Sequence, residues 1–167
     1  MKNRGIALFL ALACLLLCCG TAMAEEALQY DASRAIVAYL DEKGTSYSIA
    51  DPSSDNDVIL ISYTPSEATD LERIVVRIYV SESVATIMLP GIAEPDNSDM
   101  LKLYQTLEEI NDSISFVRLI YNPDSNVIYS SVEVPYVESD DFGHMVERYA
   151  YISALVVDEH YDELTAM

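Results

Sequence analysis

The longest regular pattern of apolar and polar residues lies between Met100 and Pro135. In its first part, apolar residues recur at helical spacing, which places them on one buried face: Met100, Leu103, Tyr104, Leu107 and Ile110. From Ser115 the period changes to two, which is typical of a strand. A second alternating segment, 127–134, follows the turn signal at 122–126. The stretch therefore predicts a helix and then a β-hairpin.

The segment before this stretch predicts one helix and several strands. Apolar spacing indicates a helix over 26–43 that Gly44 ends, although Asp31 and Ser33 are both caps from which it could start later. We expect strands at 47–50, 58–63, 74–80 and 84–89. Pro90 and Gly91 are expected to end the last of these strands.

Two more helix starts can be placed from capping residues. Asp96 or Ser98 is expected to cap the helix near Met100, and acids at 138–141 precede a last helix. The buried stripe expected on that last helix is Phe142, Met145, Tyr149, Ile152 and Val156. The predicted fold class is α+β: a single domain with an antiparallel sheet, in the order α-β-β-β(-β)-α-β-β-α.

The N-terminus has the pattern of a secretory signal peptide. Lys2 and Arg4 precede an apolar run, and small residues in an A-x-A pattern end at Ala24, so cleavage is expected there. This gives residues 1–24 as a signal peptide and 25–167 as the mature domain. A retained anchor and a lipoprotein modified at Cys19 are the alternatives; the apolar run is shorter than the ~20 residues that span a bilayer.

Charge and cysteine content narrow the function further. The chain has 9 basic and 28 acidic residues, and cleavage after Ala24 would leave 7 basic against 28 acidic residues, a net charge of −21. Such a surface repels nucleic acid and anionic lipid, so neither is expected as a partner. It would attract a basic protein or peptide, or divalent cations. All three cysteines lie in the leader, which excludes disulfides, thiol catalysis and cysteine-bound metals from the mature domain.

Catalytic and metal-binding patterns are weak. The chain lacks a glycine-rich phosphate loop and a G-x-S-x-G elbow. His144 and His160 are sixteen residues apart on the last predicted helix, too far to share a metal. Asp51, Asp55 and Asp57 could gather around calcium, but without the order of an EF-hand, and a turn is the other interpretation. No cofactor is therefore predicted.

Tyrosines on the predicted strands are the candidate binding residues. Tyr79, Tyr121 and Tyr129 fall on strand faces that also carry polar residues, among them Arg77. Tyrosine offers a large contact area with a polar tip, so such a face could dock a peptide. The other interpretation is that these rings cover the core under the helices.

The order of segments resembles a known family. The first helix ends in Gly44-Thr45-Ser46-Tyr47, strands follow over 58–89, and Leu107-Glu108-Glu109-Ile110-Asn111 leads directly into the hairpin strand 114–119. This is similar to the YbjN family, described as candidate bacterial sensory transduction regulators. The resemblance spans roughly 28–164. It implies a fold like that of type III secretion chaperones, which are acidic, often dimeric and hold extended partner segments, and it supplies no catalytic residues.

The sequence thus predicts an exported, non-enzymatic YbjN-like domain that binds a protein or peptide, and that could form a homodimer. It would work in the periplasm or outside the cell, whereas the secretion chaperones work in the cytoplasm. The alternatives are a hydrolase whose carboxylates are assembled by the fold, and a weak binder of divalent cations.

Overall fold

The computed structural model describes residues 28–166 except 51–54, 67–68, 70 and 97–98. The elements are α2 (Asp31–Lys43), β1 (Tyr47–Ile49), β2 (Asp57–Tyr63), β3 (Ile74–Val80), β4 (Val84–Ala93), α3 (Met100–Ser113), β5 (Arg118–Asn122), β6 (Val127–Pro135) and α4 (Phe142–Thr165). This is the predicted α+β order. The expected signal peptide lies outside the described residues. None of the described helices has the length and apolarity needed to cross a membrane.

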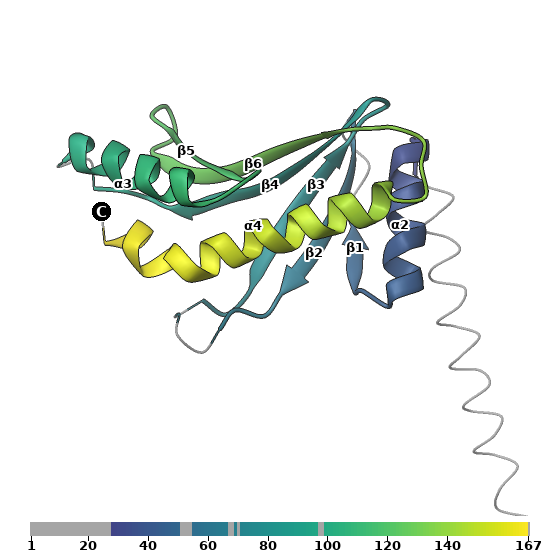
Figure 1. Ribbon diagram of the computed structural model, residues 1–167, viewed down its shortest axis with the longest axis horizontal. Coiled ribbons are helices and arrows are strands. Elements are labelled where there is room, and N and C mark those ends of the chain that lie inside the picture. The colour runs from purple at the N-terminus through teal and green to yellow at the C-terminus, as the bar shows by residue number, and fades with distance from the viewer. Residues whose placement is uncertain (1–27, 51–54, 67–68, 70, 97–98, 167) are drawn as a thin grey trace, which may run out of the picture.

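The strands form one antiparallel sheet in the order β1-β2-β3-β4-β6-β5. Helix α3 carries the chain from β4 to the far edge, so β6 returns between β4 and β5. Figure 1 shows α4 running across the strands, with α2 near one end of the sheet and α3 near the other. Helix α4 contacts β2, β3, β4, β6 and α2, and α3 contacts β5.

Strand alternation decides which side chains face the helices. In β3, Ile74, Val76, Ile78 and Val80 are buried, while the intervening residues point to the other face, as predicted. Their helical partners include fully buried side chains of α2 and α4: Ile36, Leu40, Phe142, Val146 and Ala150. A second cluster lies under α3: Leu103, Leu107, Ile110, Leu119, Ile128, Val156 and Leu164.

Two helix starts differ from those predicted. Helix α2 begins at Asp31, later than the predicted Glu26, and its N-cap is Tyr30, extended at φ −110°, and not Asp31 or Ser33. Helix α3 is capped by Asp99, whose carboxylate accepts a hydrogen bond of 3.0 Å from the Lys102 N–H. The prediction of Asp96 or Ser98 was therefore wrong by one position or more, because several acids and serines there are equally suited to capping. The Gly44 stop is confirmed, with φ 69°.

Strand β4 does not end at Pro90-Gly91, as the sequence suggested, but continues to Ala93. Its pairing with β3 stops at Arg77↔Met88, and its pairing with β6 shifts in register between Leu89 and Ala93. Pro90 has no N–H to donate across the ladder and Gly91 has a positive φ of 64°. These two residues therefore separate β4 from β3 without ending the strand.

The hairpin begins later than its alternating pattern indicates. Strand β5 starts at Arg118, and Phe116 has a positive φ of 77° with 65% of its surface exposed. The strand is instead positioned by Asn111 at the end of α3. Its side-chain amide donates to the Leu119 carbonyl at 2.9 Å and accepts from the Leu119 N–H at 2.8 Å. Tertiary contact thus overrides the local period.

The predicted buried stripes of α3 and α4 are confirmed in part: Leu103, Leu107 and Ile110 of α3 and Phe142 and Val156 of α4 are buried. Tyr104, expected in the core, is 53% exposed. On α4, Met145, Tyr149 and Ile152 are only half-buried. Apart from Phe142, Val156 and Leu164, the buried positions of α4 are small residues: Gly143, Val146, Ala150, Ser153, Ala154 and Val157. Small side chains allow α4 to lie close to the sheet and to α2, and the larger ones line its edges.

Candidate functional site

All the described helices bury their apolar residues against one face of the sheet, which leaves the opposite face without a helical cover. Register defines a row across five strands of this second face: Leu60, Arg77, Met88, Ser131 and Arg118. We call this surface the open face. With the neighbours of that row, it consists of Leu60, Arg77, Tyr79, Thr86, Met88, Arg118, Ile120, Tyr129, Ser131 and Glu133.

The open face brings together three of the four predicted binding residues. Arg77, Tyr79 and Tyr129 all lie on it, with Arg77 exposed and both tyrosines half-buried. Tyr121 does not, because it pairs with the core residue Ile128 and so points toward the helices. There its ring packs edge-on against Tyr104 at 6.1 Å between centroids. Grouping Tyr121 with the others was wrong, since its strand position has the opposite parity.

Tyr79 and Tyr129 lie on opposite sides of the row formed by Leu60, Arg77, Met88, Ser131 and Arg118, so they are separate contact points. Two strand spacings and four residues of strand length place them on the order of 16 Å apart. Half-buried Leu60 and Met88 and the 37%-exposed Ile120 add apolar surface. The open face therefore combines apolar and aromatic side chains with an equal number of polar and charged ones.

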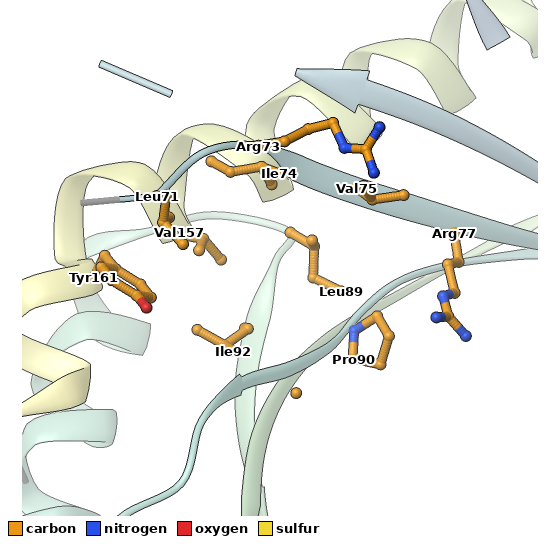
Figure 2. Close-up of a pocket in the computed structure, with 11 residues that line it drawn as sticks. Leu71, Arg73, Ile74, Val75, Arg77, Leu89, Pro90, Ile92, Val157 and Tyr161 are labelled. Carbon is orange, nitrogen blue, oxygen red and sulfur yellow. The ribbon is translucent and has the colours of Figure 1, made fainter. Parts of the chain in front are cut away.

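A cavity opens beside the open face, where β4 separates from β3 (Figure 2). It has a volume of about 200 Å³. Its lining residues come from β3, β4, the segment before β3 and helix α4: Leu71, Arg73, Ile74, Val75, Arg77, Leu89, Pro90, Gly91, Ile92, Val157 and Tyr161. Sequence analysis missed this cavity because Pro90-Gly91 was interpreted as the end of a strand.

The two histidines lie on the continuous helix α4 and do not form a joint site. The His144 ring is tilted against Tyr39, with 5.7 Å between centroids. His160 Nδ1 lies 3.3 Å from Glu163 Oε2 on the same helix. Each histidine therefore has a local partner at its own end of the helix.

The acidic turn predicted as a weak calcium candidate has a different use. Asp51 lies outside the described residues, and Asp55 is exposed. Asp57 is only 2% exposed, and its carboxylate accepts hydrogen bonds from the Gln29 N–H, the Tyr30 N–H and the Ser33 hydroxyl: 2.9, 3.2 and 2.6 Å. It thus connects the start of α2 to β2. Within the described part of the chain, acids, histidines and cysteines form no cluster of three that could hold a metal.

Tyr63 at the end of β2 is a further group that sequence reasoning missed. Its hydroxyl is buried and has no hydrogen-bond partner among the described residues. Burial raises the pKa of its phenol above the ordinary range, and the nearby charges of Glu147 and Tyr151 add to the effect. A phenol held neutral in this way is a poor base, and its ring packs against Tyr151 at 5.9 Å.

These features describe an α+β domain with helices on one face of its sheet and a second face left open. No protein-family model and no curated protein matches the chain. Its structure is similar to the crystal structure of YbjN from E. coli, a candidate transcription regulator, with 15% identity and a TM-score of 0.48. The match covers 75% of this chain and 88% of YbjN. This is a likeness of fold, and the role of YbjN is not transferred to this chain.

Proposed function

We propose that this chain is an exported, non-enzymatic YbjN-like domain that binds a basic protein or peptide through the open face. Its role would be regulatory or chaperone-like. The observation that carries the proposal is the position of the helices: those described all cover one face, and the other presents apolar and aromatic side chains. An apolar sheet face without a cover is a typical interaction surface.

The composition of the open face suits a protein contact. Tyrosine and arginine are enriched at interfaces because each combines contact area with directional hydrogen bonding. Tyr79, Tyr129 and Arg77 supply these groups, and the Arg77 guanidinium makes no hydrogen bond or ion pair with any described residue. Met88 and Ile120 supply apolar area between and beside them.

Charge favours a basic partner over a second copy of the chain. The net charge is −19, so two copies repel one another at long range, whereas a basic partner is attracted. The open face itself carries two basic side chains and one acidic side chain: Arg77, Arg118 and Glu133. The long-range attraction of a basic partner therefore comes from the acidic rest of the chain.

The test is capture of a partner by the immobilised protein from the native envelope or culture medium, at increasing salt. We expect a basic protein whose retention falls with salt and is lost in the open-face variants Ile120→Lys and Tyr129→Ala. The matched controls, Leu101→Lys and Tyr151→Ala, change side chains that are 70% and 51% exposed on the helical side. They should retain the partner.

Two results would contradict the proposal. One is a partner that binds wild-type and open-face variants equally. The other is a homodimer, seen by analytical ultracentrifugation, that dissociates on the same substitutions, because a second copy would then occupy the open face. Circular dichroism of each variant ensures that a loss of binding is not a loss of folding.

Export is tested on the cell-derived protein. N-terminal sequencing should show a mature chain that begins at Glu25, in the periplasm or the medium. A chain that retains its leader, or one that begins at a lipid-modified Cys19, would contradict this part of the proposal.

A further inference from the structure

The cavity between β3 and β4 exists because the ladder between these strands breaks off. They pair from Val80↔Ala85 to Arg77↔Met88 and no further, although β3 extends back to Ile74 and β4 on to Ala93. In the same register, Val76 and Leu89 come next, and the next pair that would exchange hydrogen bonds is Val75 and Pro90. Pro90 cannot donate a hydrogen bond, so the strands separate at this point.

The break leaves the backbone of Val75 facing the cavity. The Ser81 N–H donates to the Val84 carbonyl at 2.9 Å, which fixes the alternation of β3. Tyr79, Arg77 and then Val75 therefore turn their N–H and C=O groups toward β4. Pro90 stands opposite Val75 and has no N–H, so the Val75 C=O loses the donor that would pair with it there.

Two arginines flank Val75. Arg73 and Arg77 lie two residues before and after Val75, so both are on the same side of the strand, and Figure 2 shows both guanidinium groups beside the cavity. Both are exposed, and neither makes a hydrogen bond or ion pair with a described residue. By contrast, Arg34 and Lys43 have carboxylate partners, Asp31 and Glu42.

The absence of acid from the lining is the more telling observation. The chain has 28 acidic and only 9 basic residues, yet two of those basic residues line the cavity and none of its lining residues is acidic. Guanidinium groups bind a carboxylate, which accepts charge-assisted hydrogen bonds from them.

The rest of the lining is apolar. Leu71, Leu89, Ile92 and Val157 surround the space on the side of α4, and Tyr161 points its ring toward them (Figure 2). The volume of about 200 Å³ is below the 300–1,000 Å³ typical of sites for larger ligands, so the fitting group is short.

We propose that this cavity binds a carboxylate carried at the end of a short apolar chain. The carboxylate lies between Arg73 and Arg77, and the chain lies against Leu71 and Leu89. Two sources have this chemistry: a free aliphatic acid, and the C-terminal residue of a peptide with an apolar side chain. The site overlaps the open face at one residue, Arg77.

Isothermal titration calorimetry of the purified protein tests the proposal with two acids and their neutral analogues. The probes are octanoate and octanamide, and acetyl-Ala-Leu with a free or an amidated C-terminus. We expect an acid to bind and its amide to bind at least about tenfold more weakly, the effect of one or two lost charge-assisted hydrogen bonds. The acid that binds more tightly identifies the source.

Variants separate the site from general charge effects. Arg73→Gln and Arg77→Gln should each lower the affinity for the acid by about tenfold or more. Arg148→Gln, which removes the same charge from an exposed position on α4, should leave the affinity within about twofold. Arg73→Gln should also leave partner capture by the open face unchanged, so the two proposals fail independently.

Three results would overturn the proposal. The first is equal affinity for an acid and its amide. The second is no heat of binding from either acid up to about 10 mM, a range that would still reveal millimolar affinity. The third is an equal loss of affinity for the acid in Arg148→Gln and Arg73→Gln.

Discussion

Asp57 offers the most quantitative prediction. It is an acidic residue at the start of a strand, almost fully buried, and its carboxylate is the acceptor for the Gln29 N–H, the Tyr30 N–H and the Ser33 hydroxyl. Helix α2 has no side-chain cap of its own at Tyr30. Asp57 therefore supplies from β2 the acceptor that the helix start lacks.

Asp57→Ala would leave three donors without their acceptor in a largely buried place. Each unsatisfied donor costs about 1–3 kcal/mol, so we expect the free energy of unfolding to fall by about 3–5 kcal/mol. That is a large part of the 5–15 kcal/mol typical of a domain. Asp57→Asn keeps one acceptor oxygen without the charge and should cost about half as much.

Urea denaturation followed by far-ultraviolet circular dichroism measures this loss. With m-values near 2 kcal/mol per molar urea, Asp57→Ala should lower the midpoint by roughly 2 M at unchanged m. The matched control is Asp55→Ala, because Asp55 is an exposed neighbour and only its backbone carbonyl is used, as acceptor for the Tyr30 hydroxyl. It should change stability by less than about 0.5 kcal/mol. Equal effects of the two substitutions would refute the reasoning.

Three further predictions concern single buried groups. Gly143→Ala places a Cβ in overlap with Tyr39 Cβ and 2.8 Å from the Ala35 carbonyl oxygen, so α2 and α4 must separate. Urea denaturation should show that the free energy of unfolding falls by about 2 kcal/mol. An unchanged midpoint would contradict this contact. Ser130 Oγ is buried without a partner among the described residues, so Ser130→Ala should leave stability unchanged or raise it, and a loss above about 1 kcal/mol would show a missed hydrogen bond. Because the pKa of Tyr63 is raised in the folded state, its contribution to stability is present below about pH 10 and is lost as pH rises further; Tyr63→Phe should remove that part of the decline, and an identical pH profile would be the contrary result.

The order of elements could be predicted because local patterns determine it. Alternation in β3 and the Gly44 stop of α2 both depend on residues that are adjacent in sequence, and both are confirmed. The buried stripe of α4 was harder, because helical spacing alone allows neighbouring stripes and the tight contact at Gly143 decides between them.

The site could be predicted only in part. Tyr121 and Tyr129 are both tyrosines on neighbouring strands of the hairpin. Tyr121 pairs with Ile128 and not with Tyr129, so its side chain points to the opposite face of the sheet. Asp57 was interpreted with its sequence neighbours, although its partners lie between 24 and 28 residues away. The cavity at Pro90 forms because β4 stays paired with β6 after its pairing with β3 has ended. No local sequence pattern indicates this difference between the two sides of one strand.

The most direct test of the central claim is a photo-crosslinking comparison between the two faces of the molecule. A photoreactive phenylalanine analogue is placed at Tyr129 on the open face or at Tyr151 on the helical side, and each protein is irradiated with its captured partner. The account predicts a crosslinked product from position 129 and none from position 151. Crosslinking from position 151 alone would contradict it.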